Sequence, residues 1–275
     1  MSNLPPNSKS LPAASPTLAT STADTASQAR LLPPWLAQYP WLTFVLPFAV
    51  FMLVGSLEPT PEKPFELFGA TIEYSAYPIV YSVKIALTML AMAAVWPGYR
   101  QFAFRVSPLA LVVGAVGVVL WVGICKLELE AKLLGPLGLG WLVETGSRSA
   151  FNPFAVWPDQ PLLAYGFLAV RFWGLAIVVP VIEEFFLRGL VMRYVIDPDW
   201  WKVPFGTLST TAVIVGTLVP VAMHPAEIFA AAVWFTSITW LMFKTKNIWD
   251  CVAAHAVTNL LLGVWVVASG DWHFL

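Results

Sequence analysis

The sequence predicts an all-α membrane protein, a polytopic transmembrane helical bundle of about seven to eight helices. Of its 275 residues, 58% are hydrophobic and only 11% are charged, whereas a soluble domain carries about 25% charged residues. The mean hydropathy is +0.73, so the chain has too few polar side chains to cover a surface in water. Segments that cross lipid must pair their own backbone groups, which favours helices, and the alternation of a membrane barrel is absent.

The same composition excludes other classes of protein. The net charge is −1, so no basic face is available for nucleic acid. Cys125 and Cys251 form no pattern with histidine at zinc-finger spacing, so we expect neither a disulfide framework nor a structural zinc site. We predict no cofactor, no metal and no nucleic-acid partner.

Residues 1–35 are predicted to be a disordered tail. They are rich in Ser, Thr, Ala and Pro and contain few large apolar side chains, so they cannot bury enough apolar surface to offset chain entropy. The terminus has no basic region followed by an apolar stretch, as a secretory signal would. We therefore expect the first spanning segment to be an uncleaved anchor.

Apolar segments close to the ~20 residues that cross a bilayer as a helix follow in succession. They are 39–57, 76–96, 107–125, 162–196, 205–223, 226–243 and 248–268. The segment 162–196 is overlong: it either crosses once as a long or bent helix, or Pro180 divides it into two spans. The single crossing is favoured, and it places the basic loops 97–106 and 244–247 on the side of the N-terminal tail.

Three regions result from this division. After the tail, residues 36–161 are predicted to hold the N-terminal transmembrane helices and a long loop, and residues 162–275 a second helical bundle, which contains the candidate site described below. The long loop, 126–161, begins with KLELEAKLL. We expect a solvated connector there, with a short interfacial helix as the alternative.

Two adjacent glutamates stand out in PVIEEFFLRGLVMR, because ionisable side chains inside a membrane are costly and indicate function. Glu184 and Arg188 are four residues apart and share one helix face. Glu183 is turned by about 100° from that face, towards apolar neighbours. An unpaired carboxylate in apolar surroundings has a raised pKa, as a general base near neutral pH requires. The alternative is structural, with both glutamates tied to arginines.

Three later polar side chains complete the candidate site. His255 and Asn259 are four residues apart among small alanines, which allow close approach. Both can donate a hydrogen bond to one oxygen, as in an oxyanion hole; an interhelical polar clamp is the alternative. His224 lies between Pro220 and Pro225, which indicates a broken helix lining a cavity, where it could hold a water against Glu183.

Two further cations, Lys84 and Arg171, lie within apolar segments. Each either reaches an interface or pairs with a carboxylate, and we assign them no chemistry.

Taken in order, E-E-x-x-x-R, a His about 40 residues later and H-x-x-x-N resemble the motifs of the CPBP family. These intramembrane glutamic endopeptidases include the CAAX prenyl proteases of eukaryotes and bacteriocin-processing and immunity-type proteins of bacteria. The resemblance covers roughly residues 162–268. It implies a bundle of about eight helices with a polar cavity that opens to one side of the membrane.

The resemblance also implies a role for each residue. Glu183 matches the catalytic glutamate, and Glu184 and Arg188 complete its motif as supporting residues. His224 matches the histidine that acts with the glutamate on the water. His255 and Asn259 match the pair proposed as the oxyanion hole. The family often has Phe four residues before the second-motif histidine, where this chain has Pro220.

The sequence therefore predicts an intramembrane endopeptidase that hydrolyses a peptide bond through a glutamate-activated water. Its partners would be membrane lipid and a membrane-associated peptide or protein substrate. We expect an integral membrane protein of the bacterial inner (plasma) membrane.

Two alternatives to this function stay open. Glu183, His224 and His255 could form the zinc triad of a metalloprotease, although the H-E-x-x-H helix is absent. A non-enzymatic membrane scaffold or immunity protein could use the same side chains as buried interhelical ties.

Overall fold

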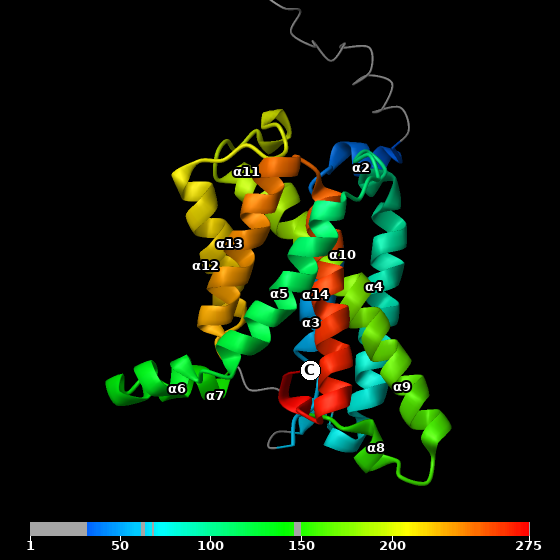
Figure 1. The fold of residues 1–275 in the computed structure, drawn as a ribbon. Coiled ribbons are helices and arrows are strands. Elements are labelled where there is room, and N and C mark those ends of the chain that lie inside the picture. The colour runs from blue at the N-terminus through cyan, green and yellow to red at the C-terminus, as the bar shows by residue number, and fades with distance from the viewer. Residues whose placement is uncertain (1–31, 62–63, 68, 146–149, 275) are drawn as a thin grey trace, which may run out of the picture.

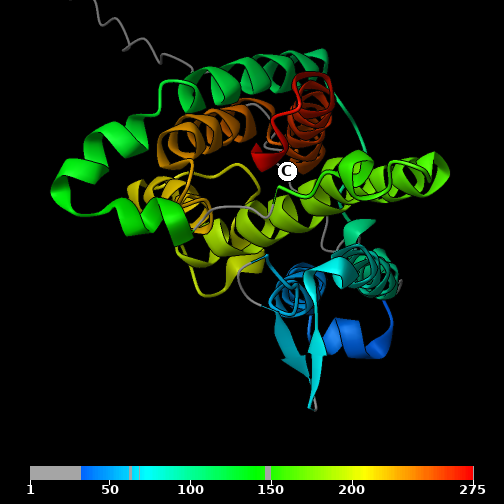
Figure 2. The same cartoon turned by 90° about the horizontal axis from the view of Figure 1, so that it is seen from below.

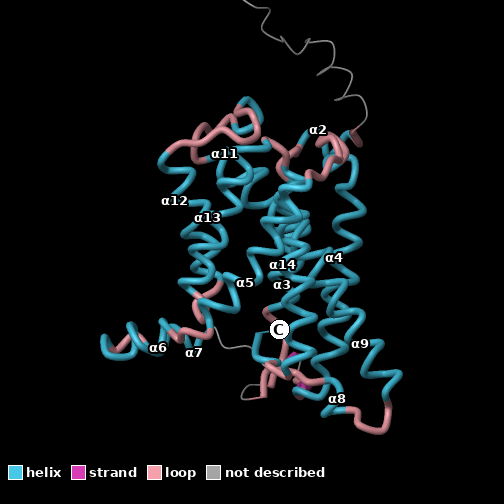
Figure 3. The backbone as a smooth tube through the Cα atoms, viewed as in Figure 1, coloured by secondary structure: helices cyan, strands magenta, loops and turns pink. Residues whose placement is uncertain are grey.

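The computed structural model describes residues 32–61, 64–67, 69–145 and 150–274. Helices dominate this part of the chain, and its only two strands form one short hairpin (Figure 3). The predicted all-α class is confirmed. The predicted disordered tail, residues 1–35, lies almost entirely outside the described residues. The first helix of the described residues, α2 (Pro34–Gln38), begins within the last residues of that range.

The apolar helices coincide with the predicted segments. In chain order they are α3 (Leu42–Gly55), α4 (Tyr77–Tyr99), α5 (Pro108–Cys125), the continuous helix Pro161–Tyr194, α12 (Thr210–Met223), α13 (Ile228–Thr245) and α14 (Ile248–Ser269). Within the described residues, five of these segments are long and apolar enough to cross a membrane, and α3 and α12 are shorter. At 14 residues each, α3 and α12 extend for only about 21 Å, less than the ~30 Å hydrocarbon core.

Short elements connect these helices. They are β1 (Phe65–Leu67), β2 (Ala70–Ile72), η1 (Tyr74–Ala76), α6 (Leu129–Leu134), η2 (Gly135–Leu137), α7 (Gly140–Thr145), α8 (Pro153–Val156), η5 (Trp200–Lys202) and η6 (Trp272–Phe274). The start of the long loop forms the short helix α6, as the alternative expected; its solvation and its place at an interface stay predictions. The Glu130 side chain in α6 accepts a hydrogen bond from the Phe229 backbone N–H at 3.0 Å, which caps α13 and fixes α6 beside it.

The long central helix passes through Pro180 without a break. It comprises α9 (Pro161–Trp173), η3 (Gly174–Val178), α10 (Val179–Glu184), η4 (Phe185–Val191) and α11 (Met192–Tyr194). The alternative in which Pro180 divides the segment into two spans is therefore wrong. A proline inside a helix removes one hydrogen bond and clashes with the carbonyl four residues earlier. Here η3 is a π-helical turn, whose wider spacing gives the proline ring room.

The helices form two groups on either side of this central helix. Seen from one end, α5, α13 and α14 lie on one side of it, and α3 and α4 lie on the other (Figure 2). The loop between α4 and α5 and the loop between α13 and α14 meet at the end that carries α2 (Figure 1). These are the loops predicted to be basic, so a single crossing of the central helix does bring them to the same end of the bundle as α2.

The outer faces of the bundle are apolar, as lipid contact requires. On α5, Leu111, Val112, Val116 and Val119 are between 48% and 69% exposed. A helix that is apolar on every side is surrounded by protein and lipid, with no face for water.

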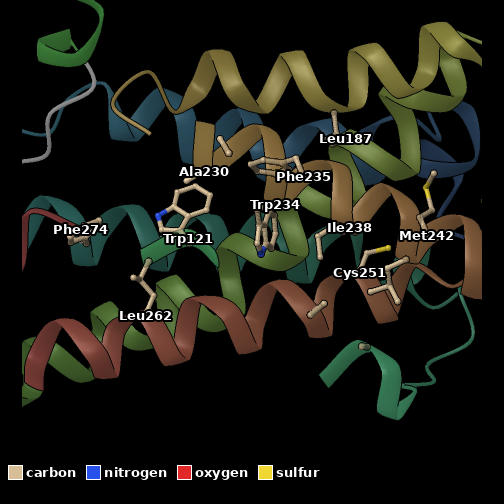
Figure 4. Close-up of a cluster of buried hydrophobic side chains, with 14 of the residues drawn as sticks. Trp121, Leu187, Ala230, Trp234, Phe235, Ile238, Met242, Cys251, Leu262 and Phe274 are labelled. Carbon is tan, nitrogen blue, oxygen red and sulfur yellow. The ribbon is translucent and has the colours of Figure 1, made fainter. Parts of the chain in front are cut away.

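The core beside the site depends on close packing of α5 against α13 and α14. A Cβ on Gly114 would lie 2.6 Å from the Ala254 carbonyl oxygen, and one on Gly117 would lie 2.7 Å from the Trp234 indole nitrogen. Thr258 donates to the Gly114 carbonyl at 2.9 Å and accepts from the Trp234 indole at 3.1 Å. Figure 4 shows Trp234 at the centre of this cluster, between Trp121 and Phe235. Small residues thus let the backbones meet, as is usual in membrane bundles.

We expect Gly114→Ala to lower the free energy of unfolding by about 1–3 kcal/mol, because the new methyl group meets the α14 backbone. Gly123→Ala is the matched control, since a Cβ at Gly123, on the same helix, has nothing within 4 Å. Unfolding of both purified variants by sodium dodecyl sulfate in mixed micelles measures the difference. Equal stability of the two variants would contradict the close-packing interpretation.

Candidate active site

The four predicted catalytic residues line one cavity of about 430 Å³ between the helices. Glu183 comes from α10, His255 and Asn259 from α14, and His224 from the turn between α12 and α13. Residues from three parts of the sequence therefore line one space that is large enough to hold water and part of a substrate.

A chain of polar contacts connects the first and third motifs. Glu184 and Arg188 are completely buried and form an ion pair, as their spacing predicts. The other carboxylate oxygen of Glu184 lies 2.9 Å from Nδ1 of His255. Nε2 of His255 lies 3.9 Å from the carboxylate of Glu183. His255 therefore stands between the two glutamates, with one ring nitrogen towards each.

The two glutamates differ in their surroundings. Glu184 has both oxygens engaged, and its side chain is 0% exposed. The Glu183 side chain is 15% exposed and lines the cavity. The helical argument that separates their roles thus agrees with the geometry: one carboxylate is held inside the protein, and the other faces the open space.

Arg188 balances the charge of Glu184 within the protein. Because the Glu184 carboxylate accepts from Nδ1 of His255, Nε2 is the ring nitrogen that faces Glu183.

His224 reaches the cavity because α12 ends early. The helix stops at Met223, since the residue before a proline, here Pro225, is disfavoured in helical conformation. In Figure 1, α12 and α13 both end well short of the lower ends of α4, α9 and α14. The turn between them thus lies within the bundle, where non-helical backbone lining a cavity is tolerated.

Pro220 orients the ring of His224 through its backbone. Nδ1 of His224 lies 2.8 Å from the Pro220 carbonyl oxygen. A carbonyl can only accept, so Nδ1 carries a hydrogen in this contact. The rings of Trp121 and Phe235 lie 5.6 Å from His224 on two sides. The departure from the family at position 220 therefore leaves this contact in place, because a carbonyl does not depend on the side chain.

Asn259 ties α14 to the central helix. Its side-chain amide donates to the Leu175 carbonyl in η3 at 2.9 Å. The π-helical turn leaves the Leu175 carbonyl accessible. A backbone group freed in this way inside a membrane needs a new partner, and the Asn259 amide supplies it. Asn259 therefore has a structural contact as well as a place on the cavity wall.

Other residues of the cavity have no assigned role from the sequence. Lys84 pairs with Glu58 at 2.6 Å, so the predicted carboxylate partner of Lys84 exists. Arg171 donates from Nη1 to the Phe151 carbonyl at 3.2 Å and forms no ion pair with a carboxylate of the described residues. The only sequence feature that marked Lys84 and Arg171 was the position of each within an apolar segment. Trp234 packs on His255 at 4.6 Å between ring centroids, and no sequence pattern marked it.

A metal-binding cluster is not formed by these side chains. In the part of the chain that the structure describes, no three His, Cys, Asp or Glu residues are placed to hold a metal ion together. The side chains of Glu183, His224 and His255 are therefore not placed to bind one metal ion together.

The fold and the site define an integral membrane protein, built as a helical bundle, with an ionisable centre beside a cavity among its helices. Residues 165–261 match the family described as Type II CAAX prenyl endopeptidase Rce1-like. This segment is therefore similar to the CAAX protease-like family, which confirms the resemblance seen in its motifs. The match supports a membrane-embedded peptidase of the CAAX protease class. No curated protein and no solved structure matches the chain.

We expect Arg188→Met to destabilise the protein by about 3–5 kcal/mol, because it leaves the buried charge of Glu184 without its cation. The double variant Glu184→Leu, Arg188→Met should recover most of this loss, since it removes both charges together. Thermal unfolding in detergent measures both. Lys202→Met is the control: its pair with Asp199 is exposed to solvent, and its loss should leave the unfolding temperature unchanged. A single variant as stable as the double one would contradict the pairing.

Proposed function

We propose that this protein is an intramembrane glutamic endopeptidase that cuts a peptide bond of a membrane-associated protein or peptide. The observation that carries the proposal is the placement of Glu183. Of the two adjacent glutamates, it is the carboxylate on the cavity wall, while Glu184 is buried against Arg188 and His255. The family match over residues 165–261 includes all the residues to which we give a role.

In the proposed reaction, ionised Glu183 takes a proton from a water in the cavity as the hydroxide oxygen attacks the scissile carbonyl carbon. His224 holds this water through the lone pair of its Nε2. The carbon–nitrogen bond then breaks, and Glu183 gives the proton to the leaving amine. Water is the only co-reactant, its oxygen ends in the new carboxyl group, and no covalent enzyme intermediate is required.

The negative charge that develops on the carbonyl oxygen needs donors aimed at it. His255 in its protonated form has an Nε2–H for this purpose, and Glu184 accepts from the opposite ring nitrogen. An amide carries two N–H donors, so the bond from Asn259 to Leu175 leaves one for the substrate. Glu184 and Arg188 contribute by fixing the ring of His255.

We expect Glu183→Gln to reduce cleavage by at least about a hundredfold, because the amide cannot accept a proton. Since the substrate is unidentified, the measurement compares the chain termini of the membrane proteome between cells that contain wild-type protein and cells that contain the variant. Glu66→Gln, an exposed glutamate in the β-hairpin, is the control and should leave the termini unchanged. Unaltered termini with Glu183→Gln, in protein of normal abundance, would overturn the assignment.

Treatment with a chelator distinguishes the zinc-dependent alternative from the proposed mechanism. The proposed mechanism predicts that purified protein keeps its activity after treatment with a strong chelator, and that its metal content does not correlate with activity. Activity lost on chelation and restored by zinc would support the metalloprotease instead.

The non-enzymatic alternative rests on a specific contact, the bond from Asn259 to the Leu175 carbonyl. Both functions predict that Asn259→Ala lowers stability by roughly 0.5–2 kcal/mol. Only the protease predicts that cleavage also falls, by roughly a hundredfold or more.

The matched control is Asp250→Ala, which removes another tie of the same helix, to Ser107 at 2.7 and 3.0 Å. Its side chain lies outside the cavity, so cleavage per folded molecule should stay at the wild-type level. If both variants lose stability and neither changes cleavage, Asn259 is a structural tie only.

The predicted location in the bacterial plasma membrane also stays a proposal.

A further inference from the structure

Arg171 is a buried cation that the proposed reaction does not use. Its side chain is 5% exposed, yet it lines the same cavity as Glu183. A guanidinium has five N–H donors, and within the described residues Arg171 uses one of them, towards the Phe151 carbonyl. A charge of this kind inside a membrane protein indicates a function and requires a partner.

The surroundings hold Arg171 firmly in place. Its guanidinium carbon lies 5.8 Å from the ring centroids of both Tyr77 and Tyr81 on α4. The two helices can approach because of Gly174: a Cβ at that position would lie 2.5 Å from the Tyr81 hydroxyl oxygen. The aromatic rings stabilise the cation, but no carboxylate of the described residues pairs with its planar donor edge.

The nearest ion pair does not supply that carboxylate. Lys84 is bonded to Glu58 at 2.6 Å and lies over the rings of Phe51 and Tyr81. Both charged groups line the cavity, and they cancel each other. The cavity end built by α3, α4 and α9 thus carries the net positive charge of Arg171.

Arg171 and Glu183 lie in one row on the central helix. Arg171, Leu175, Val179 and Glu183 follow at every fourth residue, and all four line the cavity. In a regular α-helix of about 3.6 residues per turn, a row of every fourth residue gradually rotates around the helix, away from the cavity. The π-helical turn Gly174–Val178 takes more residues per turn and keeps the row on one face.

The length of this row sets a spacing for a bound peptide. Twelve residues of helix separate Arg171 from Glu183, about 18 Å at 1.5 Å per residue. An extended peptide covers that distance with about five residues. Between the two ends the row presents only Leu175 and Val179, which suit apolar side chains.

We propose that Arg171 forms a carboxylate-binding subsite that selects substrates with an acidic group about five residues from the cleaved bond. The proposal rests on the proposed function, since Glu183 defines the place of cleavage. An arginine binds a carboxylate through two parallel hydrogen bonds, and the buried, aromatic surroundings of Arg171 strengthen them.

The test uses short synthetic peptides of alanine and leucine in which a single glutamate is moved along the chain, with glutamine peptides as the neutral set. They are offered to the full-length protein in phosphatidylcholine vesicles, and mass spectrometry identifies the cleaved bond. We expect kcat/KM to be about tenfold or more higher for glutamate peptides. The cleaved bond should move with the glutamate and stay about five residues away.

The substitution Arg171→Gln should abolish the glutamate preference, and Arg171→Lys should keep part of it. The matched control is Arg193→Gln, which removes an arginine of the same helix whose bonds go to the Val203 and Gly189 carbonyls. Glu58→Gln should increase the preference, because it frees Lys84. The preference is a ratio within one preparation, so a loss of folded protein does not change it.

Binding separates this proposal from the proposed function. Fluorescence polarisation compares labelled glutamate and glutamine peptides on wild-type protein and on Arg171→Gln. Binding that prefers glutamate through Arg171, without any cleavage, keeps the subsite and contradicts the protease. Cleavage without a preference contradicts the subsite and keeps the protease. If Arg171 instead proves to bind phosphatidylglycerol and peptides show no preference, the ligand is a lipid phosphate and the proposal is overturned.

Discussion

The complete burial of the Glu184–Arg188 ion pair is the constraint on which the rest of the site depends. Two opposite charges enclosed in a bundle within lipid are stable only if each has further partners. Arg188 has the Phe235 carbonyl on α13 at 3.2 Å, and Glu184 has His255 on α14 at 2.9 Å. The pair therefore fixes three helices relative to one another. It also determines which ring nitrogen of His255 faces the cavity, and thus what chemistry is available to Glu183.

The central helix, which carries this ion pair, also forms part of the cavity surface on which a ligand would lie. Its two π-helical stretches, Gly174–Val178 and Phe185–Val191, flank the pair of glutamates. The first frees the Leu175 carbonyl for Asn259 and aligns Arg171 with Glu183, and the second carries Arg188. Stretches of this kind are weaker than regular helix and recur at functional sites. Here the weaker backbone is compensated by side chains of α14 and α13.

Much of the fold could be predicted because lipid restricts it. Length, hydropathy and the need for internal backbone pairing determine the spans almost directly, and the i, i+4 rule predicts the pairing of Glu184 with Arg188. The contact of Glu184 with His255 joins residues 71 positions apart. It depends on how α14 is rotated against α10, which no local pattern encodes. The single crossing past Pro180 was the favoured prediction, but the π-helical turn beside the proline could not be predicted, because such a turn leaves no composition signal. The catalytic roles of the site residues stay predictions.

The short helices explain how a polar centre can exist at this depth. If α12 and α13 extended as far as α14, the turn that carries His224 would lie at the membrane surface, away from Glu183. Because α12 has only 14 residues and stops before Pro225, its end remains inside the bundle. Glu130 of α6 caps the start of α13 on the other side of this turn. The shortened helix therefore brings His224 to the cavity that Glu183 also lines. The close packing around Gly114 and Gly117 on the other side keeps α14 near enough for His255 to reach the same space.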